Sequence, residues 1–231
     1  MMTKRVLIVD DHPVIVRGLQ ELIEEETELT VVGQAGTAQE AIQAIETSYP
    51  DIIIVDISLP GKNGISLIQD IKARWISLAI IVFSRHDTLD YAERALRAGA
   101  IGYIAKDDAP ASIMTAIRYA MRGKVFLSSE INERLVHRLT YHARSDSGSL
   151  ADLLSNRELE VFEAIGRGYE TAEIADLLHV SPRTVESHRR NIKEKLGITG
   201  LTELVRRAVL WVEGQPMPLN QPDSQRTSLF S

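Results

Sequence analysis

Carboxylate side chains follow two of the apolar runs near the start of the chain. Asp10 and Asp11 come directly after Val6–Val9, and Asp56 comes directly after Ile52–Val55. In an open parallel sheet the carboxyl ends of the strands share one edge, and in a sheet of order 2-1-3-4-5 these two runs are neighbours. Three carboxylates brought together repel one another unless a cation joins them, and oxygen ligands suit a hard ion such as Mg²⁺. The spacing therefore predicts a Mg²⁺ site at this edge.

A hydroxyl and an ammonium group follow two further apolar runs. Ser84 comes after Ala79–Phe83, and Lys106 comes shortly after Ile101–Ile104. Beside a metal-bound carboxylate these groups form a cage for a phosphoryl group. Asp56 is then the nucleophile, Lys106 neutralises developing charge, and Ser84 donates a hydrogen bond to a phosphoryl oxygen. Each residue alone has an ordinary explanation, such as a helix cap for an Asp, but five such groups at four strand ends favour phosphoryl chemistry.

The elements that must position these groups alternate along the first 121 residues. Continuous β-branched runs indicate strands buried on both faces, and amphipathic stretches such as 38–47 separate them. This alternation predicts a doubly wound α/β domain with a five-stranded parallel sheet of order 2-1-3-4-5. The five expected strands are Val6–Val9, Thr30–Ala35, Ile52–Val55, Ala79–Phe83 and Ile101–Ile104.

Composition predicts the domain organisation. We expect an α/β domain at residues 1–122, a linker with a helix at 123–152, and a small all-α domain of four helices at 153–213. The polar Gly/Ser stretch at 144–149 marks the flexible part of the linker. Residues 214–231, rich in Pro, Gln and Ser, are expected to be disordered.

Overall composition excludes several classes of protein. The 231 residues are 44% hydrophobic and 25% charged, as in globular proteins, and include no cysteine, which excludes disulfides and thiolate metal sites. The short apolar run at the N-terminus does not resemble a signal peptide, and no apolar stretch approaches the length of a membrane span. We therefore expect a cytoplasmic protein without a membrane association.

The charge is unevenly distributed. The net charge of −6 argues against a nucleic-acid partner, but the first 121 residues carry 17 acidic and 11 basic side chains, whereas the remainder carries 15 of each. Ser181–Leu196 concentrates basic residues against only two glutamates. Such a cluster suits a phosphate backbone, although a solvated helix face is the simpler alternative. The basic residues are Arg183, Arg189, Arg190, Lys193 and Lys195.

Helix signals in the C-terminal half place this cluster on a particular helix. Ser155 and Glu158 form a capping box at the start of one helix, and Thr171 is expected to cap a second. Ser181 and Pro182 begin a third helix in the favoured order of N-cap and first position. Two short helices and a tight turn before a basic helix predict a DNA-binding helix-turn-helix, with a generic helical bundle as the alternative.

The N-terminal motifs resemble a bacterial two-component receiver domain over residues 4–121. The resemblance rests on Val9-Asp10-Asp11, Asp56-Ile-Ser-Leu-Pro-Gly-Lys-Asn-Gly64, Ser84 and Gly102-Tyr-Ile-Ala-Lys106. It implies that a histidine kinase or a small phosphodonor phosphorylates Asp56. It also implies that Asp11, Asp56 and the backbone carbonyl of Ser58 bind Mg²⁺ directly, whereas Asp10 acts through water.

The same resemblance implies a conformational switch. Ser84 moves toward the phosphoryl group and Tyr103 swings inward behind it, because the new dianion selects one of two pre-existing states. A plain amphipathic surface role for Tyr103 is the alternative. Asp107 follows Lys106 where many receivers carry proline, which removes no chemical group.

The C-terminal motifs resemble the LuxR-type module, so that the whole chain is similar to the NarL/FixJ subfamily of response regulators. The resemblance rests on Leu154-Ser-Asn-Arg-Glu-Leu-Glu-Val161, Glu173-Ile-Ala175 and Val180-Ser-Pro-Arg-Thr-Val-Glu-Ser-His188. It implies that Glu186, Ser187 and Arg190 face bases. Many relatives carry lysine in place of Glu186, so the family's base preference does not transfer; a G·C preference is the hypothesis because Arg can pair with guanine and Glu can accept from cytosine. Phosphate contacts are expected from Arg183, Thr184, Arg189, Asn191 and Lys193, and His188 has a structural or phosphate-facing role.

Several partners and alternatives follow from these resemblances. The implied partners are promoter DNA, a cognate histidine kinase, a second copy of the chain when phosphorylated, and RNA polymerase as a further candidate. A Mg²⁺-dependent aspartyl phosphohydrolase is disfavoured because Ile57 and Ser58 follow Asp56 without the usual second Asp, so no enzyme activity is expected. Two further alternative functions are a regulator that acts only through protein contacts and a receiver that works without phosphate.

Overall fold

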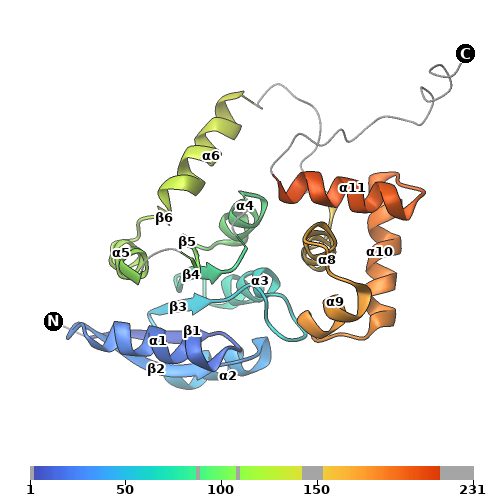
Figure 1. Ribbon diagram of the computed structural model, residues 1–231. Coiled ribbons are helices and arrows are strands. Elements are labelled where there is room, and N and C mark those ends of the chain that lie inside the picture. Colours follow the sequence, from blue (N-terminus) through green and yellow to red (C-terminus); the bar gives the residue numbers. More distant parts are fainter. Residues whose placement is uncertain (1–2, 87–88, 108–109, 142–152, 214–231) are drawn as a thin grey trace, which may run out of the picture. The chain divides into compact units, whose positions relative to one another are not determined.

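The computed structural model describes residues 3–86, 89–107, 110–141 and 153–213, with side chains from 137 to 141 left out (Figure 1). The chain divides into two compact units, Met1–Ser145 and Asp146–Ser231. The predicted flexible stretch at 144–149 and the predicted disordered tail lie outside the described residues. Among the described residues, no helix is both long enough and apolar enough to cross a membrane.

The N-terminal unit contains a parallel sheet of order β2-β1-β3-β4-β5-β6. Its first five strands confirm the predicted runs and their order. Their bounds are Lys4–Val9 (β1), Leu29–Ala35 (β2), Ile52–Val55 (β3), Ala79–Ser84 (β4) and Gly102–Ala105 (β5).

The sixth strand corrects the prediction of a five-stranded sheet. Phe126–Leu127 (β6) pairs in parallel with β5, inside the stretch that the sequence assigns to a linker. Two residues are too few to produce a strand pattern, and tertiary packing decides the outcome. Phe126 packs against the apolar core and its ring meets that of Tyr119 edge-on, with centroids 5.6 Å apart.

Helices cover both faces of the sheet because successive strand side chains point to opposite faces. Helices α1 (Pro13–Glu24) and α5 (Pro110–Ala120) share one core with the side chains of Ile8, Ile54 and Ile81. The other helices are α2 (Ala38–Ser48), α3 (Gly64–Arg74), α4 (Leu89–Ala98) and α6 (Ser129–Tyr141). Helix α2 contacts β1 and β2, α3 contacts α2 and α4, and α6 packs on α4. The result is the doubly wound arrangement that the sequence predicts.

The C-terminal unit is entirely helical in its described part. It consists of α8 (Asn156–Gly166), α9 (Thr171–Leu177), α10 (Pro182–Leu196) and α11 (Leu201–Val212). Helix α8 packs against α11 and α10, and α10 packs against α9. The buried side chains of Phe162, Ile174, Val185, Ile192 and Leu204 form its core.

Two of the three predicted caps in this unit are confirmed, and one is wrong. Ser155 and Glu158 form the capping box, and the Ser181 hydroxyl accepts the backbone N–H of Thr184. Thr171, however, is the first residue of α9, and the N-cap is Glu170. The reason is tertiary: the Thr171 hydroxyl bonds to side chains of α10 and not to its own helix.

Candidate phosphoryl-transfer pocket and nucleic-acid interface

The predicted acidic cluster forms at the carboxyl edge of the sheet. Asp10 lies just beyond β1 and Asp56 just beyond β3, which are hydrogen-bonded neighbours. One ligand atom from each of Asp10, Asp11, His12 and Asp56 lies within 4.8 Å of the others. The strand order therefore brings together groups that are far apart in the sequence, and the oxygen-rich set could hold a metal ion.

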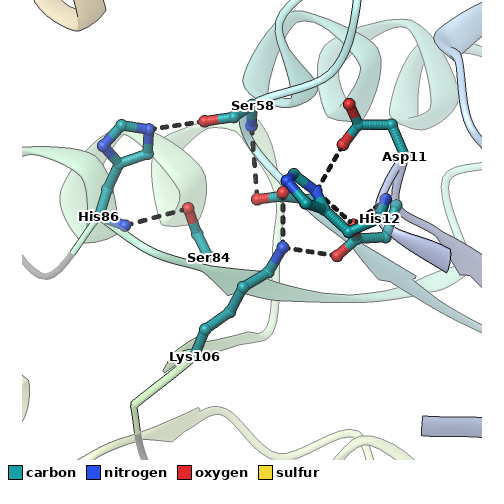
Figure 2. Close-up of polar contacts among 8 residues, drawn as sticks. Asp11, His12, Ser58, Ser84, His86 and Lys106 are labelled. Atoms are coloured by element: carbon teal, nitrogen blue, oxygen red, sulfur yellow. Dashed lines mark hydrogen bonds and ion pairs between the residues drawn. The ribbon is translucent and has the colours of Figure 1, made fainter. Parts of the chain in front are cut away.

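Lys106 links the two buried carboxylates. Its Nζ lies 2.5 Å from Asp10 Oδ2 and 2.7 Å from Asp56 Oδ2 (Figure 2), and all three side chains are at most 4% exposed. Burial makes such contacts strong, because little water screens them. Three carboxylates and one ammonium group still leave an excess of negative charge in the cluster, which suits a divalent cation.

Two histidines that the sequence analysis overlooked border the pocket. His12 Nδ1 lies 2.8 Å from Asp11 Oδ1 and 3.1 Å from Asp10 Oδ1. His86 Nε2 lies 2.9 Å from Ser58 Oγ (Figure 2). The His86 ring also stacks on Tyr91, with centroids 4.1 Å apart. Their positions directly after Asp11 and two residues after Ser84 are the signals that could have indicated them.

The two predicted switch residues meet at His86. Ser84 is fully buried, and its Oγ accepts the backbone N–H of His86 at 3.3 Å. Tyr103 is also fully buried, and its hydroxyl donates to the His86 carbonyl at 2.5 Å. A plain surface role for Tyr103 therefore does not fit its position. Ser58 completes the pocket wall, with its N–H 3.4 Å from Asp56 Oδ1.

The predicted DNA-facing residues lie along α10 in different environments. Arg183, Glu186 and Arg190 are exposed, whereas Ser187, Asn191 and Lys193 are half-buried. Together with Arg189, Leu201 and Leu204, all of these except Asn191 line a groove of about 520 Å³. Thr184 is half-buried and its hydroxyl lies 2.8 Å from Ser181 Oγ at the start of the helix.

Arg189 and His188 turn toward the rest of the helical unit. The Arg189 side chain is only 16% exposed and donates to Thr171 and Glu186. His188 is half-buried, and its Nδ1 has no hydrogen-bond partner among the described residues. Burial lowers the pKa of His188, so that the neutral imidazole is favoured.

A parallel sheet with this pocket, followed by a helix-turn-helix, defines a regulator that couples phosphoryl chemistry to nucleic-acid binding. Residues 6–118 match the response regulator receiver domain, and residues 152–208 match the luxR family of bacterial regulatory proteins. The oxygen regulatory protein NreC of Staphylococcus aureus is 32% identical over 209 residues, which is 89% of this chain and 96% of NreC.

Solved structures show the same combination of domains. RcsB of Salmonella typhimurium aligns over 92% of this chain and 99% of its own, with 26% identity and a TM-score of 0.65. RcsB of Salmonella enterica bound to promoter P1flhDC with the phosphomimetic BeF3⁻ aligns over 88% of this chain and 97% of its own, with 26% identity and a TM-score of 0.60. The chain therefore belongs to the LuxR-family response regulators. It is a phosphorylation-dependent, DNA-binding transcription regulator of a two-component system.

A cluster of charged side chains on α11, next to the C-terminal end of α10, makes the stability of this unit depend on pH in a testable way. Glu203 accepts hydrogen bonds at 2.8 Å from Arg206 and from Arg207, and Arg207 Nη1 also donates to the Leu196 carbonyl at the end of α10. The bonds from Arg206 and then Arg207 lower the pKa of Glu203 from 4.5 to about 2. The ionised Glu203 carboxylate thus stabilises the fold above pH 4.5, and its stabilising contribution is lost as the pH falls toward 2.

We expect Glu203→Gln to lower the free energy of unfolding of this unit near pH 7 by on the order of 1 kcal/mol, because the carboxylate is partly exposed and screened. The loss should shrink between pH 4.5 and 2. Denaturant unfolding followed by Trp211 fluorescence in a Trp75→Phe background measures it, because the chain has two tryptophans. The control is Glu194→Gln, an exposed carboxylate without an ion pair among the described residues. A pH-independent loss would contradict the assignment.

Proposed function

We propose that Asp56 accepts a phosphoryl group from a cognate histidine kinase or a small phosphodonor. The observation that supports this most is the buried Lys106 bridge, which sets a cation 2.7 Å from Asp56 Oδ2. Asp56 attacks the phosphorus atom, the bond to the donor breaks, and Lys106 counters the negative charge that develops.

We propose that Asp10, Asp11, Asp56 and the backbone carbonyl of Ser58 hold Mg²⁺, with Asp10 acting through water. The side chains of Asp10, Asp11 and Asp56 converge, and carboxylate and carbonyl oxygens are the donors that fit that ion. When bound, Mg²⁺ supplies positive charge to the transferring phosphoryl oxygens. Ser84 then donates a hydrogen bond to the phosphoryl group, and Tyr103 packs inward behind Ser84.

We propose that a phosphorylated homodimer binds promoter DNA through α10. Glu186, Ser187 and Arg190 face bases, and Arg183, Thr184, Asn191 and Lys193 contact phosphates. RcsB of Salmonella enterica bound to promoter DNA, and a structure of two RcsB dimers bound to two parallel DNAs, support this arrangement. The kinase and RNA polymerase are the proposed protein partners. We also propose domain boundaries at residues 122, 152 and 213, with β6 and α6, which follow residue 122, packing on the N-terminal unit.

The first test is intact mass spectrometry after incubation with Mg²⁺ and acetyl phosphate. We expect a gain of about 80 Da, the mass of one phosphoryl group, and no gain for Asp56→Asn. The same gain in both proteins would place the phosphoryl group elsewhere. Repeated turnover of phosphate esters by the purified chain would instead favour a phosphohydrolase.

A further inference from the structure

Three side chains from two helices form a closed hydrogen-bonded triangle, which we call the Thr171 triangle. Thr171 Oγ1 donates to Glu186 Oε1 at 2.8 Å, and Arg189 Nη1 donates to Thr171 Oγ1 at 2.5 Å. Arg189 Nη1 also lies 3.3 Å from Glu186 Oε1. Thr171 begins α9, whereas the other two residues lie one turn apart on α10.

The bonding capacity of these groups limits what else they can do. The Thr171 hydroxyl has one proton, which it donates to Glu186, so that it has none left for a phosphate. The Arg189 side chain is 16% exposed and is held against Thr171 and Glu186. A guanidinium group in that position neutralises a neighbouring carboxylate more readily than it reaches a DNA backbone.

Glu186 differs from its two partners because it is still accessible. Its side chain is 60% exposed and lines the groove of α10 together with Arg183 and Arg190. Only Oε1 takes part in the triangle, which leaves Oε2 as an acceptor on the exposed face. Two bonds to Oε1 hold the carboxylate in one orientation, which reduces the entropy lost when that acceptor meets a ligand.

We propose that Glu186 determines DNA specificity and that Arg189 and Thr171 are positioning residues that orient it. The proposal rests on DNA binding through α10. A carboxylate only accepts hydrogen bonds, so it selects an exocyclic amino group in the major groove, first of all N4 of cytosine. It disfavours the acceptor atoms of guanine and thymine and is repelled by phosphates, so its contribution is discrimination and not general affinity.

The experiment uses the full chain, treated with acetyl phosphate and Mg²⁺, and a randomised double-stranded DNA library. We expect the wild type to enrich cytosine at one position of each half-site, and Glu186→Gln to reduce that preference by about 10-fold or more. Arg189→Gln and Thr171→Val should reduce the preference at the same position and leave the others intact. Thr171→Ser, which keeps the hydroxyl, should keep the cytosine preference of the wild type.

The salt dependence of binding separates positioning from phosphate contact. Loss of a phosphate contact weakens binding to all sequences alike and lowers the slope of log K against log salt by about 1. We expect this for Lys193→Gln but not for Arg189→Gln. Uniform weakening with a lower slope for Arg189→Gln would overturn the proposal, as would an unchanged cytosine preference in Glu186→Gln. A wild type that enriches no sequence would instead refute DNA reading by α10 itself.

Misfolding is a separate outcome that the same set of variants detects. Thermal unfolding of each variant shows whether the contact between α9 and α10 survives. A Thr171→Val chain that keeps its melting temperature and its affinity for random DNA, but loses the selected position, supports the proposal. A folded Thr171→Val chain that keeps the selected position contradicts it.

Discussion

Lys106→Met should slow phosphoryl uptake from acetyl phosphate by about 100-fold or more, the usual effect of removing a preorganised charge partner. The Lys106 ammonium group contacts both Asp10 and Asp56, and the Lys106 side chain is only 4% exposed. Without it, the charge that develops on the phosphoryl oxygens loses the cationic side chain that lies beside Asp56. The measurement is the rate at which the protein gains about 80 Da, with Mg²⁺ and donor in excess.

The same variant has a second effect that does not depend on activity. Removing the ammonium leaves buried carboxylates without their partner, which destabilises a fold by about 3 kcal/mol or more. Mg²⁺ should recover more stability in the variant than in the wild type, because it supplies the missing positive charge. Unfolding midpoints with and without Mg²⁺ measure this difference.

The matched control is Lys62→Met, which removes the same group from a half-exposed position in the same unit. Among the residues that the structure describes, Lys62 pairs only with Asp70, and exposed ion pairs contribute little. We expect its rate and stability to stay close to those of the wild type. Equal rates for Lys106→Met and Lys62→Met would exclude the proposed role of Lys106.

Gly64→Ala should destabilise the N-terminal unit by about 3 kcal/mol, at the upper end of what overpacking costs. A Cβ at this position would lie 2.1 Å from the Asp56 carbonyl oxygen and 2.8 Å from the Ile57 Cα. These are backbone atoms, so no side-chain rotation can relieve the clash. Because the loop that must move carries Asp56, we also expect slower phosphoryl uptake.

Gly18→Ala provides the comparison for this substitution. Gly18 lies within α1, and nothing lies within 4 Å of the Cβ that alanine would add. Alanine at such a site favours the helix by about 0.5–1 kcal/mol. Urea unfolding followed by Trp75 fluorescence in a Trp211→Phe background measures both variants. A Gly64→Ala protein as stable as Gly18→Ala would show that the loop after β3 tolerates displacement.

The amino-acid sequence specifies the features of this protein that depend on near neighbours. Continuous apolar runs identify five strands, and Ser155 with Glu158 identifies the start of α8, because a capping box joins residues only three apart. The carboxylates could also be placed from the sequence. Each directly follows a strand, and parallel strands present their carboxyl ends at one edge.

Tertiary structure decides the features that join distant or weakly patterned segments. β6 is two residues long and forms because the Phe126 side chain packs against the apolar core beside β5. His86 reaches Ser58, and Thr171 bonds to Glu186 and Arg189 in place of capping its helix. A hydroxyl or an imidazole can bond to many partners, and its sequence neighbours do not determine which of them packing brings within reach. These contacts therefore appear only when the helices and strands are assembled.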